Sequence, residues 1–218
     1  MTATAFLFDL DGTLADTLPD IASTTNHVRA RFDLPPVDDD TVRSFIGDGA
    51  RALLLRALRD VLPDPGAARD RRLDEAYALY TEHHDGQCTQ RTTLFAGARD
   101  HVERLRRDGC ALAIVTNKPE RFAIPVARHL GLDDCFPVVV GGDTVAPKKP
   151  DPAPLRFALQ QLGAEGARVT MVGDGLQDVR AGKAFGARTI ACLFGYADPD
   201  ALRTEGADEY WRAFGVAT

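Results

Sequence analysis

The chain has 218 residues, a net charge of −6 and a hydrophobic fraction of 44%, which suits one large domain or one domain with a small companion. Charges of both signs are scattered without a basic block, which excludes the footprint of a nucleic-acid-binding protein. The cysteines are far apart and form no Cys-x-x-Cys pair, so neither a zinc site nor a redox motif is indicated. With no basic leader and no stretch of membrane-spanning length, we expect a soluble cytoplasmic protein.

The chain opens with an apolar run at residues 5–8, which ends in Asp9 and the turn-forming pair Asp11-Gly12. A short apolar run bounded by a turn signal is typical of a buried strand. In an open α/β sheet, ligands bind beyond the carboxyl ends of the strands. Two carboxylates this close do not readily stay ionised together unless a cation lies between them. Asp9 and Asp11 are therefore candidate ligands, and hard oxygen ligands of this kind suit Mg²⁺.

Residues 18–90 carry helical patterns and no convincing strand. Helices are expected over residues 18–31, from residue 38 onward, and over residues 51–61 and 70–84. A segment of this length is near the size that can hold a small core of its own. Because it follows the first strand and precedes the rest of the sheet, we predict that residues 18–90 form an inserted helical domain, with hinges near residues 15–19 and 86–92.

From residue 93 onward, predicted strands and helices alternate. The strands are expected at residues 111–115, 137–140, 169–172 and 189–193, and the helices at residues 97–108, 119–130, 153–162 and 176–185. This alternation implies right-handed βαβ units and one parallel sheet. The predicted fold class is therefore α/β, with a doubly wound parallel-sheet core formed by residues 1–17 and 91–218. The tail after Gly195 has no clear pattern.

Polar residues follow two of the later strands as well. Thr116-Asn117-Lys118 follows the second strand, where a hydroxyl and exposed backbone N–H groups would form a good cradle for phosphoryl oxygens. A threonine that caps the next helix would explain the same pattern. Asp174 ends the fourth strand and Asp178 lies on the first turn of the next helix, where the helix dipole alone would favour carboxylates.

Taken in order, these segments resemble the motifs of the haloacid dehalogenase superfamily. They are Asp9-Leu10-Asp11-Gly12-Thr13-Leu14, Thr116, Lys148-Lys149-Pro150-Asp151-Pro152, and Gly173-Asp174 followed by Asp178. The resemblance implies a Rossmann-like core with an inserted helical cap. The Lys-Pro-x-Pro pattern places the motif lysine at Lys149, although spacing alone does not exclude Lys148. Gly175 departs from the pattern, since many relatives have Ser there.

The resemblance also implies a role for each motif residue. Asp9 would be the nucleophile, and Asp11 the general acid and base. Mg²⁺ would be bound by Asp9, Asp174 and the backbone carbonyl of Asp11. Thr116, Asn117 and Lys149 would bind the phosphoryl group, and Thr116 and Lys149 would also be catalytic. Asp178 would orient Lys149 or bind a metal-bound water.

Within the superfamily, the sequence is most similar to the phosphoglycolate phosphatases. The similarity lies in residues 8–17, 46–50, 115–119, 141–143 and 148–150. It implies Mg²⁺-dependent hydrolysis of a phosphomonoester through an aspartyl-phosphate, with 2-phosphoglycolate as the expected substrate. A sugar-phosphate phosphatase or mutase, a pyrophosphatase and a nucleotidase remain alternatives.

Other classes are disfavoured by single residues. A dehalogenase lacks the acid/base that Asp11 supplies, and a phosphonatase needs a cap lysine, whereas residues 18–90 contain none. A signalling receiver domain also gathers Asp, Thr and Lys around Mg²⁺. It is shorter, however, and its phosphorylated Asp ends an internal strand, so these features disfavour a receiver domain. Fold analogy alone would not exclude it.

Substrate choice is expected to depend on the cap, because the core motifs all bind the phosphoryl group and Mg²⁺. Gly47 and Gly49 let backbone N–H groups approach a ligand closely, and a helix begins directly afterwards. Arg51 on its first turn could pair with a small carboxylate. The alternative is an interhelix loop with a solvated arginine. The expected partner is a small phosphorylated metabolite, with no nucleic acid or membrane, and the chain is expected to be a monomer or homodimer.

Overall fold

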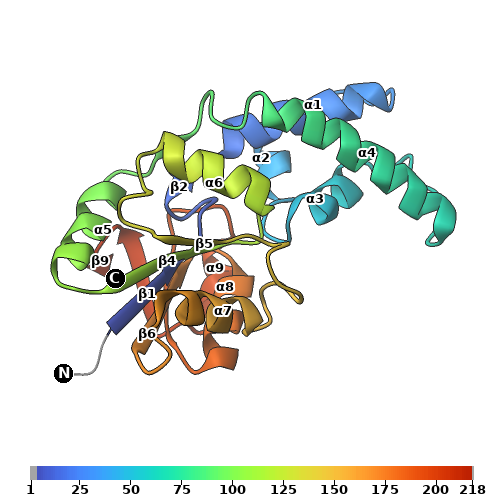
Figure 1. The fold of residues 1–218 in the computed structure, drawn as a ribbon. Coiled ribbons are helices and arrows are strands. Elements are labelled where there is room, and N and C mark those ends of the chain that lie inside the picture. Colours follow the sequence, from blue (N-terminus) through green and yellow to red (C-terminus); the bar gives the residue numbers. More distant parts are fainter. Residues whose placement is uncertain (1–3, 218) are drawn as a thin grey trace.

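The structure is a computed structural model that describes residues 4–217, and its centre is a seven-stranded sheet (Figure 1). The strand order is β5-β4-β1-β6-β7-β8-β9, and the neighbouring strands pair in parallel except β8 and β9. Their bounds are β1 (Thr4–Phe8), β4 (Ala111–Val115), β5 (Val138–Val140), β6 (Arg168–Gly173), β7 (Arg188–Cys192), β8 (Glu209–Ala213) and β9 (Val216–Ala217).

Helices cover both faces of the sheet, which explains why its strands are continuous apolar runs. In β1, Ala5 and Leu7 pack into one hydrophobic cluster and Phe8 into the other. The first cluster includes side chains of α7 (Ala153–Leu162) and α8 (Leu176–Phe185), and the second includes those of α5 (Ala98–Arg107) and α6 (Glu120–His129). The helix α9 (Pro199–Glu205) packs beside α8. The core is therefore a three-layer α/β/α arrangement, as predicted.

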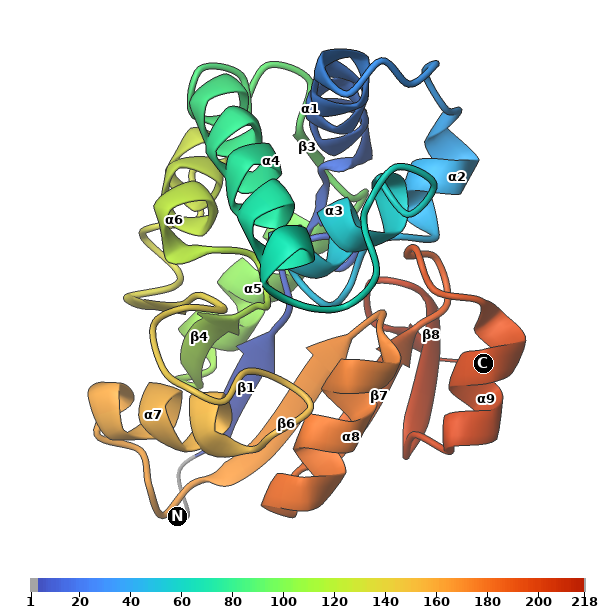
Figure 2. The same ribbon diagram turned by 90° about the vertical axis from the view of Figure 1, so that its right-hand side faces the viewer.

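The cap consists of helices that lie over the upper ends of the strands in Figure 2. Its helices are α1 (Leu18–Arg31), α2 (Asp39–Arg43), α3 (Ala50–Ala57) and α4 (Ala67–Asp85). They share a hydrophobic cluster that includes Val28, Leu54 and Tyr80, and this cluster reaches the core at Phe122 on α6. The cap thus buries apolar side chains of its own while it remains in contact with the core.

The two chain crossings between core and cap are joined to each other. Short strands β2 (Ala15–Asp16) and β3 (Thr93–Leu94) pair antiparallel. The buried Asp20 carboxylate accepts hydrogen bonds from the backbone N–H of Thr92 and from its hydroxyl, at 3.0 and 2.9 Å. These contacts bracket the predicted insertion at residues 18–90, whose limits remain a prediction.

The core strands and helices confirm the predicted α/β class, and two local differences have physical causes. The helix expected to reach residue 61 ends at Ala57, after which Leu58 accepts the N–H groups of Val61 and Leu62 in a tighter turn. The unpatterned tail contains α9, β8 and β9. In β8 only Trp211 is fully buried, so this near-edge strand lacks the apolar run that marks the central ones. Within residues 4–217, no helix is long and apolar enough to span a membrane.

Candidate active site

A buried lysine lies between two carboxylates at the strand ends. Lys149 Nζ lies 3.2 Å from Asp9 Oδ1 and 2.6 Å from Asp178 Oδ1, and it donates to the Val115 carbonyl at 2.6 Å. Burial lowers the pKa of Lys149, but Asp178 and Asp9 outweigh that effect and raise it above its ordinary value. Lys149 is thus held as an ammonium group against Asp9. The neighbouring Lys148 is exposed and instead donates to the backbone carbonyl of Asp48 in the cap.

Asp174 directly follows β6 and is oriented through both of its oxygens. Oδ1 accepts the Thr13 hydroxyl and Oδ2 accepts the Tyr196 backbone N–H, each at 2.7 Å. Burial and the charge of Asp9 raise the pKa of Asp174 to about 7. Asp9, Asp174 and Asp178 each offer a carboxylate oxygen, and these oxygens lie within 4.8 Å of one another. This excess of buried negative charge and the all-oxygen donor set fit a hard divalent cation such as Mg²⁺.

Asp178 contacts both Lys149 and the backbone that follows β6. Its Oδ1 accepts a hydrogen bond from Lys149 Nζ, and its Oδ2 accepts one from the Gly175 backbone N–H at 2.9 Å. Both oxygens therefore already have protein partners. Such contacts fix the orientation of neighbouring groups in metal sites.

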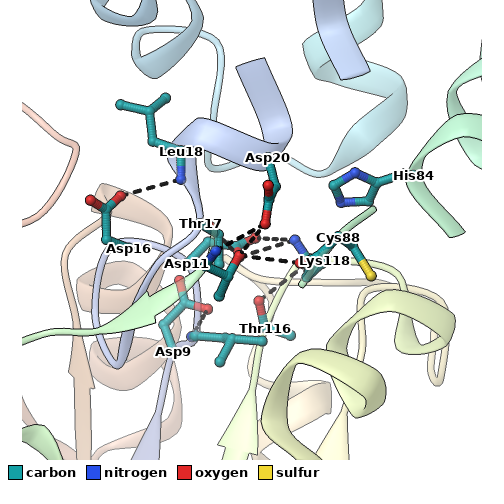
Figure 3. A network of polar contacts seen from close by, with 12 residues as sticks. Asp9, Asp11, Asp16, Thr17, Leu18, Asp20, His84, Cys88, Thr116 and Lys118 are labelled. Carbon is teal, nitrogen blue, oxygen red and sulfur yellow. Dashed lines mark hydrogen bonds and ion pairs between the residues drawn. The ribbon is translucent and has the colours of Figure 1, made fainter. Parts of the chain in front are cut away.

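Asp11 turns its carboxylate away from that cluster. Its Oδ1 accepts the Thr17 hydroxyl at 2.7 Å, and Lys118 Nζ lies 3.1 and 3.3 Å from its two oxygens. Figure 3 shows both contacts, which come from chain segments far apart in the sequence. The turn between Asp9 and the cap needs glycine at Gly12, where φ is +81° and a Cβ would lie 2.2 Å from Asp174 Oδ2. The two motif carboxylates thus face different surroundings.

Thr116 and Asn117 follow β4, as predicted. The buried Thr116 Oγ1 accepts the Lys118 backbone N–H at 3.2 Å. The Asn117 side chain donates to the carbonyls of Gly47 and Lys149, at 3.0 and 2.9 Å, and the predicted phosphate binding by Asn117 remains a prediction. Its Oδ1 is buried and has no partner among residues 4–217. Asn117 therefore links the cap loop to the segment that carries the buried lysine.

A cavity of about 640 Å³ separates the site from the cap. Among the predicted site residues, it is lined by Asp9, Asp11, Gly47, Gly49, Thr116, Asn117 and Asp174. Arg51 is not brought into this cavity: its guanidinium pairs with Asp74 at 2.5 Å and lies 5.4 Å from the centre of the Tyr77 ring. The arginines that do line the cavity are Arg43, Arg56 and Arg180.

Sequence reasoning assigned no role to Lys118, Thr17 or Tyr196, which contact Asp11 or Asp174. For Lys118 a signal existed, because it directly follows the Thr116-Asn117 segment at a predicted strand end. Tyr196 lies in the tail, far from any motif in the sequence. Only the fold brings it to the site.

A parallel α/β core that gathers carboxylates and a buried lysine at its strand ends, under a helical cap, defines a phosphatase class of hydrolase. Residues 6–192 match the model of the haloacid dehalogenase-like hydrolases, and the chain belongs to that family. It is a phosphatase of this family.

Individual relatives support the same assignment. A phosphoglycolate phosphatase of Chromobacterium violaceum is 40% identical over 94% of this chain and 90% of its own length. An N-acetylmuramic acid 6-phosphate phosphatase of Pseudomonas aeruginosa is 38% identical over 92% of this chain and 86% of its own. The crystal structure of CbbY from Rhodobacter sphaeroides in complex with phosphate superimposes with a TM-score of 0.75 at 27% identity, covering 98% of this chain and 95% of that one.

Proposed function

We propose that this protein is a Mg²⁺-dependent phosphomonoesterase that acts through an aspartyl-phosphate on Asp9 and has 2-phosphoglycolate as its substrate. The observation that carries the proposal is the contact of Asp9 with Lys149 and its position near Asp174, with Asp11 on the same cavity but outside that cluster. A nucleophile and an acid/base need such different surroundings to play different roles.

In the first step, an Asp9 oxygen forms a bond to phosphorus as the bond from phosphorus to the ester oxygen breaks. Asp11 gives its proton to that leaving oxygen and the alcohol departs. In the second step, Asp11 takes a proton from water, and the resulting hydroxide attacks the phosphorus. Asp9 is released as a carboxylate together with inorganic phosphate.

The surrounding groups stabilise the negative charge on the phosphoryl oxygens. Lys149, the Thr116 hydroxyl and nearby backbone N–H groups would supply positive potential, since catalysis of phosphoryl transfer is mainly positioning and neutralisation. Mg²⁺ would be held by Asp9, Asp174 and the Asp11 backbone carbonyl, and when bound would add a charge that neutralises the phosphoryl oxygens. Asp178 would keep Lys149 aimed at Asp9, consistent with the 2.6 Å contact between them.

For the substrate, 2-phosphoglycolate is supported by the name of the Chromobacterium violaceum relative and by the glycine loop in the cavity wall. A phosphorylated sugar that carries a carboxylate is the second candidate. It is favoured by the cavity volume of about 640 Å³ and by the N-acetylmuramic acid 6-phosphate phosphatase relative. Both candidates join a phosphomonoester to a carboxylate, which Arg43 or Arg56 in the wall could attract.

A steady-state screen tests the proposal. Purified protein with Mg²⁺ would be assayed on 2-phosphoglycolate, N-acetylmuramic acid 6-phosphate, glucose 6-phosphate, pyrophosphate and AMP, with phosphate release measured. We expect the highest kcat/KM on 2-phosphoglycolate and loss of turnover in excess EDTA. Full activity in EDTA would refute the metal assignment, and a higher kcat/KM on the sugar acid would favour the second candidate. An isomerised sugar phosphate without phosphate release would indicate a mutase.

A further inference from the structure

Tyr196 touches both the carboxylate cluster and the point where the chain enters the cap. It lies on the loop after β7, and its backbone N–H donates to Asp174 Oδ2 at 2.7 Å. Its hydroxyl accepts the backbone N–H groups of Thr17 and Leu18 at 2.7 and 2.9 Å, and it donates to Asp16 Oδ1 at 2.9 Å. One residue thus spans the motif carboxylate and the first hinge.

The hydroxyl of Tyr196 accepts the first N–H group of α1, that of Leu18, which also lies 3.3 Å from Asp16 Oδ1. The first N–H groups of a helix have no partner within the helix and are usually satisfied by the N-cap side chain. Thr17 occupies that position but makes no such bond, because its hydroxyl donates to Asp11. A phenol can accept two hydrogen bonds and donate one, which matches the contacts of Tyr196. Burial and the nearby Asp11 and Asp16 raise the pKa of Tyr196, so the donated proton is retained.

The contacts continue from the hinge to Asp11. Thr17, whose backbone Tyr196 holds, donates its hydroxyl to Asp11 Oδ1 at 2.7 Å (Figure 3). The Tyr196 ring also packs against the turn after Asp11, since a Cβ on Gly12 would lie 2.8 Å from its Cδ2. Tyr196 therefore contacts Asp174 directly and reaches Asp11 through Thr17.

We infer that Tyr196 is a positioning residue that fixes the entry into the cap, Thr17, Asp11 and Asp174 as one unit. Its hydroxyl acts on Asp11 through Thr17, and its backbone N–H orients Asp174. A cap that departs from this position would therefore release the acid/base from its alignment. The inference rests on the roles proposed above for Asp11 and Asp174, and it assigns to Tyr196 no contact with the reacting atoms.

The test is Tyr196→Phe, which keeps the ring and removes the hydroxyl. The matched control is Tyr210→Phe, because the Tyr210 hydroxyl also donates a hydrogen bond, to the backbone carbonyl of Arg203, but lies on β8 away from the site. We expect kcat on 2-phosphoglycolate to fall about tenfold in Tyr196→Phe, since small misplacements of a catalytic group lower rates steeply. KM should stay within about twofold, because the lost hydroxyl faces the hinge. The control should match the wild type in both.

A double-mutant cycle with Thr17→Val tests the route through Thr17. We expect each single change to lower kcat and the double variant to lose little more than the larger single loss, because coupled residues are not additive. Thr17→Ser keeps the hydroxyl and should retain most of the wild-type kcat. If Thr17→Val does not fold, the kcat of Tyr196→Phe beside that of Tyr210→Phe decides the inference.

Several results would overturn the inference. One is a kcat for Tyr196→Phe within twofold of the wild type. The others are fully multiplicative losses in the double variant with Thr17→Val, or a loss of kcat in Tyr210→Phe as large as that in Tyr196→Phe. Failure of the proposed function looks different, because the wild type itself would then show no Mg²⁺-dependent hydrolysis.

Discussion

The carboxylate cluster of the core and the glycine loop of the cap face one cavity but are held in different ways. In the cluster, Asp9, Lys149 and Asp178 are at most 7% exposed in their side chains and contact one another through charged atoms. In the loop, residues 46–50 contact the core through backbone carbonyls, those of Gly47 and Asp48. Removing one partner of a buried charged contact leaves an uncompensated charge, whereas backbone contacts leave most side chains free to vary. The difference suits constant phosphoryl chemistry combined with variable substrate choice.

The largest effect is expected at the nucleophile. Asp9→Asn should lower kcat by at least about 10⁴-fold, because the amide cannot form the acyl phosphate. The fold should persist, since an amide of nearly the same shape replaces the carboxylate. Phosphate release and the thermal midpoint would be measured beside Asp60→Asn, which changes an exposed carboxylate. Near-normal kcat in Asp9→Asn would contradict the covalent mechanism. It would also contradict the assignment of the phosphoryl chemistry to the core cluster.

The adjacent lysines provide a direct comparison of the two regions. Lys149→Met removes the charge between Asp9 and Asp178, so we expect a loss of about 10³-fold in kcat and reduced stability, because breaking a buried ion pair leaves an uncompensated charge. Lys148→Met removes only an exposed contact to the cap loop and should change kcat/KM less than about fivefold. Comparable losses in the two variants, measured by kcat and urea unfolding, would contradict the assignment of the motif role to Lys149 alone.

The residues of the core site that directly follow strands could be predicted from sequence. Lys149 and Asp178 lie instead on the loop after β5 and on α8. Parallel strands bring their carboxyl ends to one edge, so Asp9, Thr116 and Asp174 meet however the loops run. The single glycine after Asp11 could also be read as a turn, and its φ of +81° agrees. Where position follows from sheet topology, residue order was enough.

The cap wall could not be predicted in the same way. Arg51 was chosen for its place on the first turn of a helix, but α3 packs beside α4, and Asp74 and Tyr77 on α4 hold its guanidinium. Arg43 and Arg56 line the cavity instead. Which face of a short helix meets the cavity depends on how it packs against its neighbours, and residue spacing does not determine that. For Asn117, likewise, the position after β4 follows from the strand pattern, but the direction of the side-chain amide depends on the cap loop and the segment around Lys149.

The loop contact can be broken at Gly49, where φ is +84° and a Cβ would lie 2.8 Å from the Asn117 backbone oxygen. Gly49→Leu should push the loop off the core and raise KM for 2-phosphoglycolate about tenfold or more, while KM for 4-nitrophenyl phosphate changes far less. Gly66→Leu is the control, because Gly66 also has positive φ but has nothing within 4 Å of the added atom. If both substrates suffered equally, or neither did, the loop would not determine specificity.

The smallest effect concerns how the cap is held from within. The buried His84 ring lies edge-on to the Phe122 ring, with 4.8 Å between the ring centres. It hydrogen-bonds the Thr24 hydroxyl at 2.9 Å, and 1% of its surface is exposed. Burial first, then the charges of Lys118 and His83, lower its pKa to about 2. The folded state therefore binds fewer protons here than the unfolded state below about pH 6.5, the ordinary histidine value. This contribution to stability is complete above that pH and is lost as the pH falls.

We therefore expect the free energy of unfolding to fall between pH 7 and pH 5 with a contribution from His84 of at most about 1.4 kcal/mol per pH unit, the value for one proton. His84→Phe keeps a ring against Phe122 and cannot titrate, so its urea midpoints should depend less on pH. The slope is the readout, because the lost bond to Thr24 lowers stability equally at every pH. His129→Gln, at an exposed histidine on α6, should keep the wild-type slope. A pH slope in His84→Phe equal to that of the wild type would mean that the interior of the cap accommodates a charged histidine, as the core cluster accommodates its charges. A flatter slope would mean that neutral packing stabilises the cap, whereas ion pairs stabilise the core.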